Sequence, residues 1–176
     1  RASNGAERHV CWILASYAAM AENVAMSAPI IRPALAHEYD EVARVWMESW
    51  VSTGLAEASN FLLANLRARV RKEIEDGWSL FLADDGGTFA AMLALHLPQK
   101  YLDQLFVAPE YQGKGIGRQL LAFTRQRLPD EIWLRCVREN EKAWRWYERE
   151  GFVYEKEEIS QVTGFMMKYY RWTRSN

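Results

Sequence analysis

The sequence is poor in the side chains that build disulfide frameworks and zinc sites. It contains two cysteines, Cys11 and Cys136, and three histidines that are scattered along the chain. Two thiols cannot make a disulfide framework, and without a cluster of histidines they cannot make a zinc site. We therefore expect no bound metal and a reducing, cytoplasmic compartment.

Neither sign of charge is in surplus, and long apolar runs are absent. Lys and Arg together number 22, Asp and Glu together number 23, and the net charge is −1. Non-specific nucleic-acid binding needs a surplus of cations to displace counterions, so we expect no nucleic-acid partner. Because no apolar run approaches the roughly 20 residues of a membrane span, we expect no membrane partner either.

What the sequence does contain is the composition of a single globular domain. Of its 176 residues, 49% are hydrophobic, 26% are charged and 13% are aromatic. The apolar periodicity predicts helices and strands alternating in a mixed α/β layer structure. The expected strands are 29–33, 78–83, 88–97, 101–107, 132–137, 152–159 and 165–172, and the expected helices are 37–50, about 60–76, 115–128 and 141–150.

Residues 1–28 are interpreted as an N-terminal extension, and residues 29–176 as the main domain. The segment Val10–Ala21 is nearly all apolar and follows Arg8 and His9. We expect a helical extension that packs on the domain or on a partner chain. A secretory signal peptide and a tag are the alternatives.

A glycine-rich run lies between an expected strand and an expected helix. Without a Cβ the backbone of this run can approach a ligand closely. The unpaired amides and the dipole of the following helix favour a phosphate or a diphosphate. The alternative is a turn that serves tight helix–strand packing. The run is Gln112, Gly113, Lys114, Gly115, Ile116, Gly117 and Arg118, in which the lysine and the arginine add positive charge.

The glycine spacing excludes two other phosphate-binding loops. A Walker loop needs Gly-Lys-Ser/Thr, but Gly117 is followed by Arg118. A dinucleotide fingerprint that starts at Gly113 needs glycine at position 118, and one that starts at Gly115 needs glycine where Leu120 stands.

The run resembles the acetyl-CoA signature of the GNAT superfamily of N-acetyltransferases, Gln/Arg-x-x-Gly-x-Gly/Ala. Gln112, Gly115 and Gly117 occupy its defining positions. A second block of the family's pattern follows downstream, and the resemblance extends over roughly residues 29 to 172. That second block consists of Asn140, Ala143, Tyr147, Gly151 and Phe152.

The resemblance implies a GNAT-type α/β fold: a mixed, mostly antiparallel twisted sheet, flanked by helices, whose fourth and fifth strands splay apart. Acetyl-CoA would lie in that gap as the acyl donor, with its diphosphate on the amides from Gln112 to Arg118. The implied contacts of its pantetheine arm are the backbone of Leu105, Phe106 and Val107, and the residues implied at its thiol end are Asn140 and Ala143.

The resemblance also implies direct transfer of the acetyl group to an amine within a ternary complex. A backbone amide near Val107 would stabilise the oxyanion. Tyr147 would be the general acid to the departing thiolate, since a tyrosine with a pKa of about 10 is protonated at neutral pH. The alternative for Tyr147 is a core aromatic beside Trp144 and Trp146.

The general base is left open by the sequence. The glutamate that some family members carry falls near Tyr101 in this chain, so that match fails. Asp103, two residues along on the same strand face, is the nearest carboxylate and our first candidate. His96 on the preceding strand is the second candidate.

The acceptor is expected to be an amine-bearing small molecule or peptide. Four aromatic residues are explained either by an apolar wall of the acceptor site or by plain core packing: Trp46, Trp50, Phe61 and Trp78. The acidic run Glu155, Glu157 and Glu158 is explained better by a solvated strand face than by attraction of a cationic amine. Homodimerisation is left open. The alternatives to an enzyme are a non-catalytic acyl-CoA sensor and a protein-interaction module.

Overall fold

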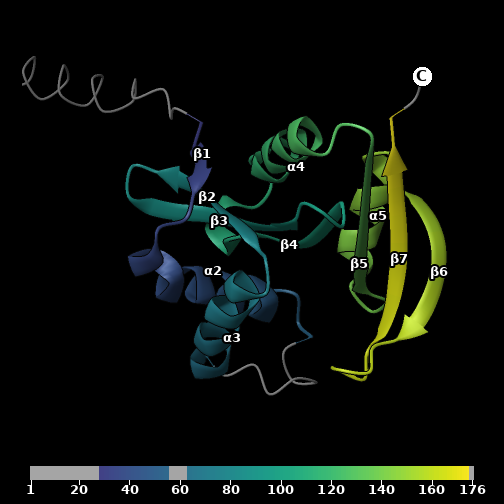
Figure 1. Cartoon of the computed structure of the whole chain (residues 1–176), viewed down its shortest axis with the longest axis horizontal. Helices are drawn as coiled ribbons and strands as arrows, with labels where there is room; N and C mark the ends of the chain where they lie inside the picture. The colour runs from purple at the N-terminus through teal and green to yellow at the C-terminus, as the bar shows by residue number, and fades with distance from the viewer. Residues whose placement is uncertain (1–27, 56–62, 175–176) are drawn as a thin grey trace, which may run out of the picture.

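The computed structural model of the chain describes residues 28–55 and 63–174 (Figure 1). The predicted order of helices and strands is confirmed, with bounds that shift by a few residues. The expected N-terminal extension, except for its last residue Ala28, and the expected start of the second helix near residue 60 lie outside the described residues. The elements are β1 (Ile30–Pro33), α2 (Tyr39–Val51), α3 (Leu63–Glu75), β2 (Ser79–Asp85), β3 (Thr88–His96), β4 (Tyr101–Val107), α4 (Ile116–Arg127), β5 (Glu131–Val137), α5 (Glu141–Arg149), β6 (Val153–Ile159) and β7 (Met166–Thr173).

The strands form one seven-stranded sheet in the order β1-β2-β3-β4-β5-β7-β6. Every neighbouring pair is antiparallel except β4 and β5, which are parallel. This parallel pairing involves only Tyr101 with Trp133 and Leu102 with Leu134. Beyond Leu102, β4 stays paired with β3 as far as Val107, while β5 turns away toward β7 (Figure 1). The expected splay of the fourth and fifth strands is therefore confirmed.

Helices cover both faces of the sheet. In Figure 1, α2 and α3 lie on one side of β2, β3 and β4, and α4 lies on the other. The apolar positions that repeat along α2, including Val42 and Trp46, are buried against the first face. Leu120 of α4 and Tyr147 of α5 are buried against the second face. Because β3 is covered on both faces, its sequence is a nearly continuous apolar run.

The N-cap residues of α4 and α5 define where these two helices begin. Gly115 is the N-cap of α4 and has a left-handed backbone, with φ of 83°. Asn140 is the N-cap of α5, and its side chain accepts a hydrogen bond from the amide of Ala143 at 3.3 Å. Both helices therefore begin at the open end of the gap between β4 and β5.

None of the helices in the described ranges combines the length and the hydropathy that crossing a bilayer requires.

Candidate active site

Two cavities meet where β4 and β5 separate. The larger has a volume of about 500 Å³ and reaches from the glycine run to the start of α5. The smaller has a volume of about 140 Å³ and lies between the sheet, α2 and α5. Four residues line both cavities and form their common boundary: Leu105, Phe106, Asn140 and Ala143.

The three glycines of the run serve the larger cavity in two different ways. Gly113 and Gly115 have positive φ values of 78° and 83°. A Cβ at either position would meet no atom within 4 Å, so the backbone faces open space. A Cβ at Gly117 would lie 3.4 Å from the ring of Trp146, because here α4 packs closely on α5. Tight packing therefore accounts for Gly117, whereas at Gly113 and Gly115 the missing Cβ leaves the backbone open to the cavity.

The amides of the run are open to a ligand. Among the residues that the structure describes, no protein acceptor receives an amide hydrogen of Gly113 through Arg118, and the first helical bond runs from the Gln119 amide to the Gly115 carbonyl at 3.2 Å. These donors sit at the positive end of α4 and line a cavity. Such a cluster is suited to an anion with several oxygens, such as a diphosphate.

The Gln112 side chain holds the cavity wall together. Its Nε2 donates to the Val107 carbonyl at 3.1 Å and to the Ser52 hydroxyl at 3.2 Å. Lys142 Nζ donates to its Oε1 at 3.1 Å. Gln112 therefore connects the end of β4 to α2 and α5, which fixes the position of the glycine run.

Several cations surround the larger cavity, and not all were expected. Arg118 lines it, with its Nε 2.7 Å from a carboxylate oxygen of Glu150. Lys142 and Arg149 also line it, and sequence reasoning missed both. Their spacing around Trp146 on a helix would have placed all three on one face of α5. The Lys114 side chain does not line the cavity, since its Nζ lies 5.0 Å from the ring centroid of Tyr111.

Tyr147 lines the smaller cavity from α5. Its side chain is packed between Trp146 and Phe152, and the residue is 7% exposed. Burial raises the pKa of Tyr147 above its ordinary value, so the hydroxyl keeps its proton. Among the described residues, the influences on this hydroxyl are burial and the nearby Cys136, and no hydrogen bond to a protein group is found for it. The residue is thus a core aromatic that still offers a free donor to the cavity.

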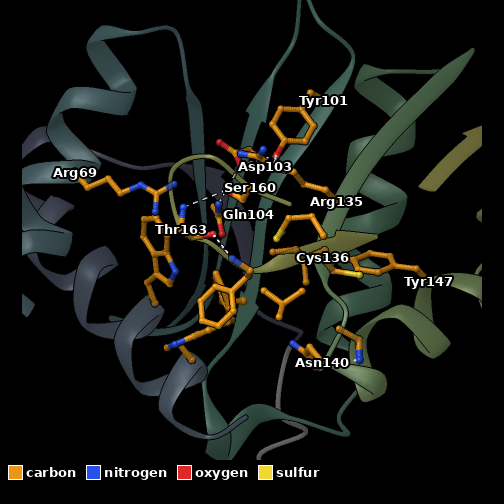
Figure 2. Close-up of a pocket in the computed structure, with 18 residues that line it drawn as sticks. Arg69, Tyr101, Asp103, Gln104, Arg135, Cys136, Asn140, Tyr147, Ser160 and Thr163 are labelled. Atoms are coloured by element: carbon orange, nitrogen blue, oxygen red, sulfur yellow. Dashed lines mark hydrogen bonds between the residues drawn. The ribbon is translucent and has the colours of Figure 1, made fainter. Parts of the chain in front are cut away.

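Cys136 lies beside Tyr147 in the same cavity (Figure 2). Sequence reasoning did not select it. Burial raises the pKa of its thiol to about 12. Since the thiolate is the reactive form of cysteine, this side chain is a poor nucleophile.

Asp103 also lines the smaller cavity and is held by three donors. Its carboxylate accepts hydrogen bonds from Trp78 Nε1 at 2.7 Å, the Tyr101 hydroxyl at 2.9 Å and Gln104 Nε2 at 3.0 Å. His96 does not line the cavity, and its Nε2 lies 3.7 Å from Asp103 Oδ2. The two candidates for the base are therefore neighbours, with Asp103 in front and His96 behind it.

The two explanations of the tryptophans, an acceptor wall and core packing, apply to different residues. Trp46 and Trp50 line the smaller cavity, whereas Trp78 is buried behind Asp103, and Phe61 lies outside the described residues. The acidic run on β6 lines neither cavity. Its members pair with basic neighbours, which agrees with a solvated strand face: Glu155 with Arg171, Glu157 with Lys168 and Glu158 with Lys156.

Comparison with protein families identifies the architecture. A family model described as the acetyltransferase (GNAT) family matches residues 39–152. The chain belongs to the GNAT family of acetyltransferases. The matched segment runs from α2 to the residue before β6. It contains every residue that lines the larger cavity, whereas part of the smaller cavity is lined by residues 160–167, beyond the match. No curated protein matches the chain.

Solved GNAT structures share the fold at low sequence identity. An acetyltransferase from Thermus thermophilus is 20% identical with a TM-score of 0.70, covering 85% of this chain and 99% of its own. The PaiA N-acetyltransferase from Thermoplasma acidophilum, in complex with coenzyme A, is 20% identical with a TM-score of 0.63 and coverages of 84% and 100%. Spermidine N-acetyltransferase from Vibrio cholerae, in complex with CoA and spermine, is 20% identical with a TM-score of 0.61 and coverages of 82% and 94%.

Proposed function

We propose that this GNAT protein is an N-acetyltransferase that moves the acetyl group of acetyl-CoA directly to an amine in a ternary complex. The observation that carries the proposal is that two cavities meet and that each contains hydrogen-bond donors without a protein acceptor. The larger ends in unpartnered amides from Gly113 to Arg118, and the smaller holds the unpartnered hydroxyl of Tyr147, both among the residues that the structure describes. Related GNAT proteins crystallised with coenzyme A support the choice of donor.

The donor site is proposed along the larger cavity. The amides from Gly113 to Arg118 bind the diphosphate, and the edge of β4 from Leu105 to Val107 binds the pantetheine arm. That edge is available because the pairing of β4 with β5 ends at Leu102. Asn140 and Ala143 then line the thiol end, at the boundary with the smaller cavity.

When bound there, acetyl-CoA supplies a thioester carbonyl for attack by the amine. The Val107 amide is our proposed donor to the carbonyl oxygen. Tyr147 is our proposed general acid, because a buried phenol with a raised pKa is a protonated donor at neutral pH. Its hydroxyl has no competing acceptor among the described residues.

The proposed base is Asp103, acting through water. An alkyl amine with a pKa of about 10.4 must lose a proton before it attacks. Asp103 is the carboxylate that lines the smaller cavity, where the amine has to lie. Its Oδ2 accepts a hydrogen bond from Trp78 and retains a lone pair for a water molecule. His96 behind it is the second proton acceptor in this arrangement.

The test is release of free thiol from acetyl-CoA, read with a chromogenic disulfide against a panel of amines, together with a titration of CoA binding. We expect turnover with at least one amine. CoA binding without turnover on any amine would favour a non-catalytic sensor. Absence of CoA binding would favour an interaction module.

A further inference from the structure

The smaller cavity contains more positive than negative charge. The charged side chains that line it are Arg69 on α3, Arg135 on β5 and Asp103 on β4. The two arginines approach from opposite sides in Figure 2, with Asp103 near Arg135. A cavity built for a purely cationic amine would show the reverse balance, because like charges at close range repel.

Arg135 makes no direct ion pair within the described part of the chain, and the Tyr101 hydroxyl links it to Asp103. No carboxylate of residues 28–55 or 63–174 lies within the 4.0 Å that defines an ion pair with its guanidinium. Its Nε donates to the Tyr101 hydroxyl at 3.0 Å, and that hydroxyl donates to Asp103 Oδ1 at 2.9 Å. Burial raises the pKa of Tyr101, so the hydroxyl keeps the proton that it donates. The relay fixes the guanidinium through Nε, and Tyr169 is a further hydrogen-bond partner of this side chain. Among those described residues, neither terminal nitrogen has a carboxylate within ion-pair distance.

Arg69 is held differently on the opposite wall. Its guanidinium lies 4.8 Å from the ring centroid of Trp46, and its Nε lies 3.2 Å from a carboxylate oxygen of Glu73. Stacking on an aromatic face holds a guanidinium in place while its edge stays available for hydrogen bonds. Arg69 therefore adds a second, partly compensated positive charge.

We infer that the acceptor is a compact amine that also carries a carboxylate, as a free amino acid does, and that Arg135 binds this carboxylate. The inference rests on the proposed function and specifies its acceptor class. A planar guanidinium matches a carboxylate in two-point hydrogen bonding. The cavity of about 140 Å³ suits a small acceptor, since pockets for larger ligands occupy about 300–1,000 Å³.

The experiment compares acceptors that differ only in the carboxylate. Amino acids are assayed beside their carboxamides, their decarboxylated amines and spermidine, and kcat/KM is taken from thiol release. We expect at least one amino acid to exceed its own carboxamide by about 10-fold or more, because a charged hydrogen bond is worth about 1.5–3 kcal/mol. Spermidine should be a poor acceptor.

The matched variants are Arg135→Gln and Arg145→Gln. Arg145 lies on α5, pairs with Glu141 and lines neither cavity. Arg135→Gln should lower kcat/KM for the carboxylate acceptor by about 10- to 100-fold and leave the carboxamide within about threefold. Arg145→Gln should change neither value. Unaltered affinity of Arg135→Gln for CoA will show that this variant is folded.

Each outcome bears on one of the two proposals. Preference for neutral or cationic amines, or equal losses on both acceptors in Arg135→Gln, overturns the carboxylate inference and leaves acetyl transfer intact. Turnover with none of the amines overturns the proposed function and the inference together. If Arg135→Gln fails to bind CoA, the acceptor is titrated calorimetrically into the CoA-saturated wild type instead. Binding of the amino acid but not of its carboxamide supports the inference. Equal binding of the two overturns it.

Discussion

The two cavities differ in how the chain builds them. The larger is lined mainly by one continuous segment, from Leu105 to Arg118, together with one face of α5. The smaller draws single side chains from distant elements, such as Arg69, Asp103 and Arg135. The larger offers backbone donors, which any sequence can supply if glycine permits the geometry. The smaller offers side chains, whose identity selects the ligand.

Under the proposed function, this contrast separates the binding of the donor from the selection of the acceptor. Backbone amides at Gly113–Arg118 and an open strand edge suit a donor common to many proteins. The arrangement of Arg135, Tyr101 and Asp103 depends on individual residues. Substitutions in the first region should therefore affect every acceptor alike, and substitutions in the second should discriminate between acceptors.

The largest expected effect is the loss of donor binding in Gly115→Glu. Gly115 has φ of 83°, where a side chain is strained, and glutamate would place negative charge against the diphosphate. We expect no measurable CoA binding by calorimetry and no turnover. The control is Gly86→Glu, since Gly86 has φ of 62° and open space around its Cβ but lines neither cavity. CoA binding to Gly115→Glu at the wild-type affinity would show that the phosphate site lies elsewhere.

The next effect concerns the boundary between the cavities. Tyr147→Phe should lower kcat by about 10²–10⁴-fold with every acceptor, because the donor to the leaving thiolate is lost. CoA affinity should be unchanged. Tyr154→Phe is the matched control, since Tyr154 is exposed on β6 and lines neither cavity.

The pH profile sharpens the same prediction. A raised pKa extends the protonated range of Tyr147 upward, so loss of this proton should not reduce kcat below about pH 10. A fall in kcat as the pH rises through neutrality that disappears in Tyr147→Phe would contradict the raised pKa of Tyr147.

A smaller effect is expected when the wall of the larger cavity is loosened. Gln112→Ala removes the hydrogen bonds to Val107, Ser52 and Lys142. At roughly 1 kcal/mol each, with partial replacement by water, the dissociation constant for CoA should rise about 10-fold. Gln126→Ala, on the exposed side of α4, is the control. An unchanged dissociation constant would mean that Gln112 does not position the glycine run.

The smallest effect on either cavity is expected from breaking the ion pair between Arg32 of β1 and the buried Glu38. Arg32 holds the pKa of Glu38 down at about 2. The unfolded carboxyl titrates near 4.3, so this stabilisation is fully present above that pH and is lost as the pH falls toward 2. Glu38→Gln should cost about 1–3 kcal/mol in the free energy of unfolding at pH 7 and flatten its loss between pH 4.5 and 2.

Thermal unfolding across pH measures this effect, with the exposed Glu75→Gln as the control. Acceptor preference should not change in Glu38→Gln. An equally steep loss of stability in Glu38→Gln and the wild type would show that this ion pair does not govern the acid limb.

Local signals predicted the elements better than the pockets. The strand Tyr101–Val107 was predicted to the residue, because turn residues bound its compact apolar run. The splay of the fourth and fifth strands came only through the family resemblance, and the order of the strands was not predicted, since both depend on pairings such as Trp133 with Tyr101 that no local pattern encodes. Arg135 was not selected because Tyr101 and Asp103, to which its hydrogen bonds connect it, lie on another strand. Of the two interpretations of Trp78, core packing agrees with the structure, in which its buried indole donates a hydrogen bond to Asp103.

The most direct measurement is a crystal structure of the protein with CoA. We expect the diphosphate to lie against the amides from Gly113 to Arg118. We expect the thiol to lie at the boundary between the two cavities, beside Leu105 and Ala143 and within reach of Tyr147. A diphosphate bound away from these amides, or a thiol that points out of the smaller cavity, would contradict this expectation.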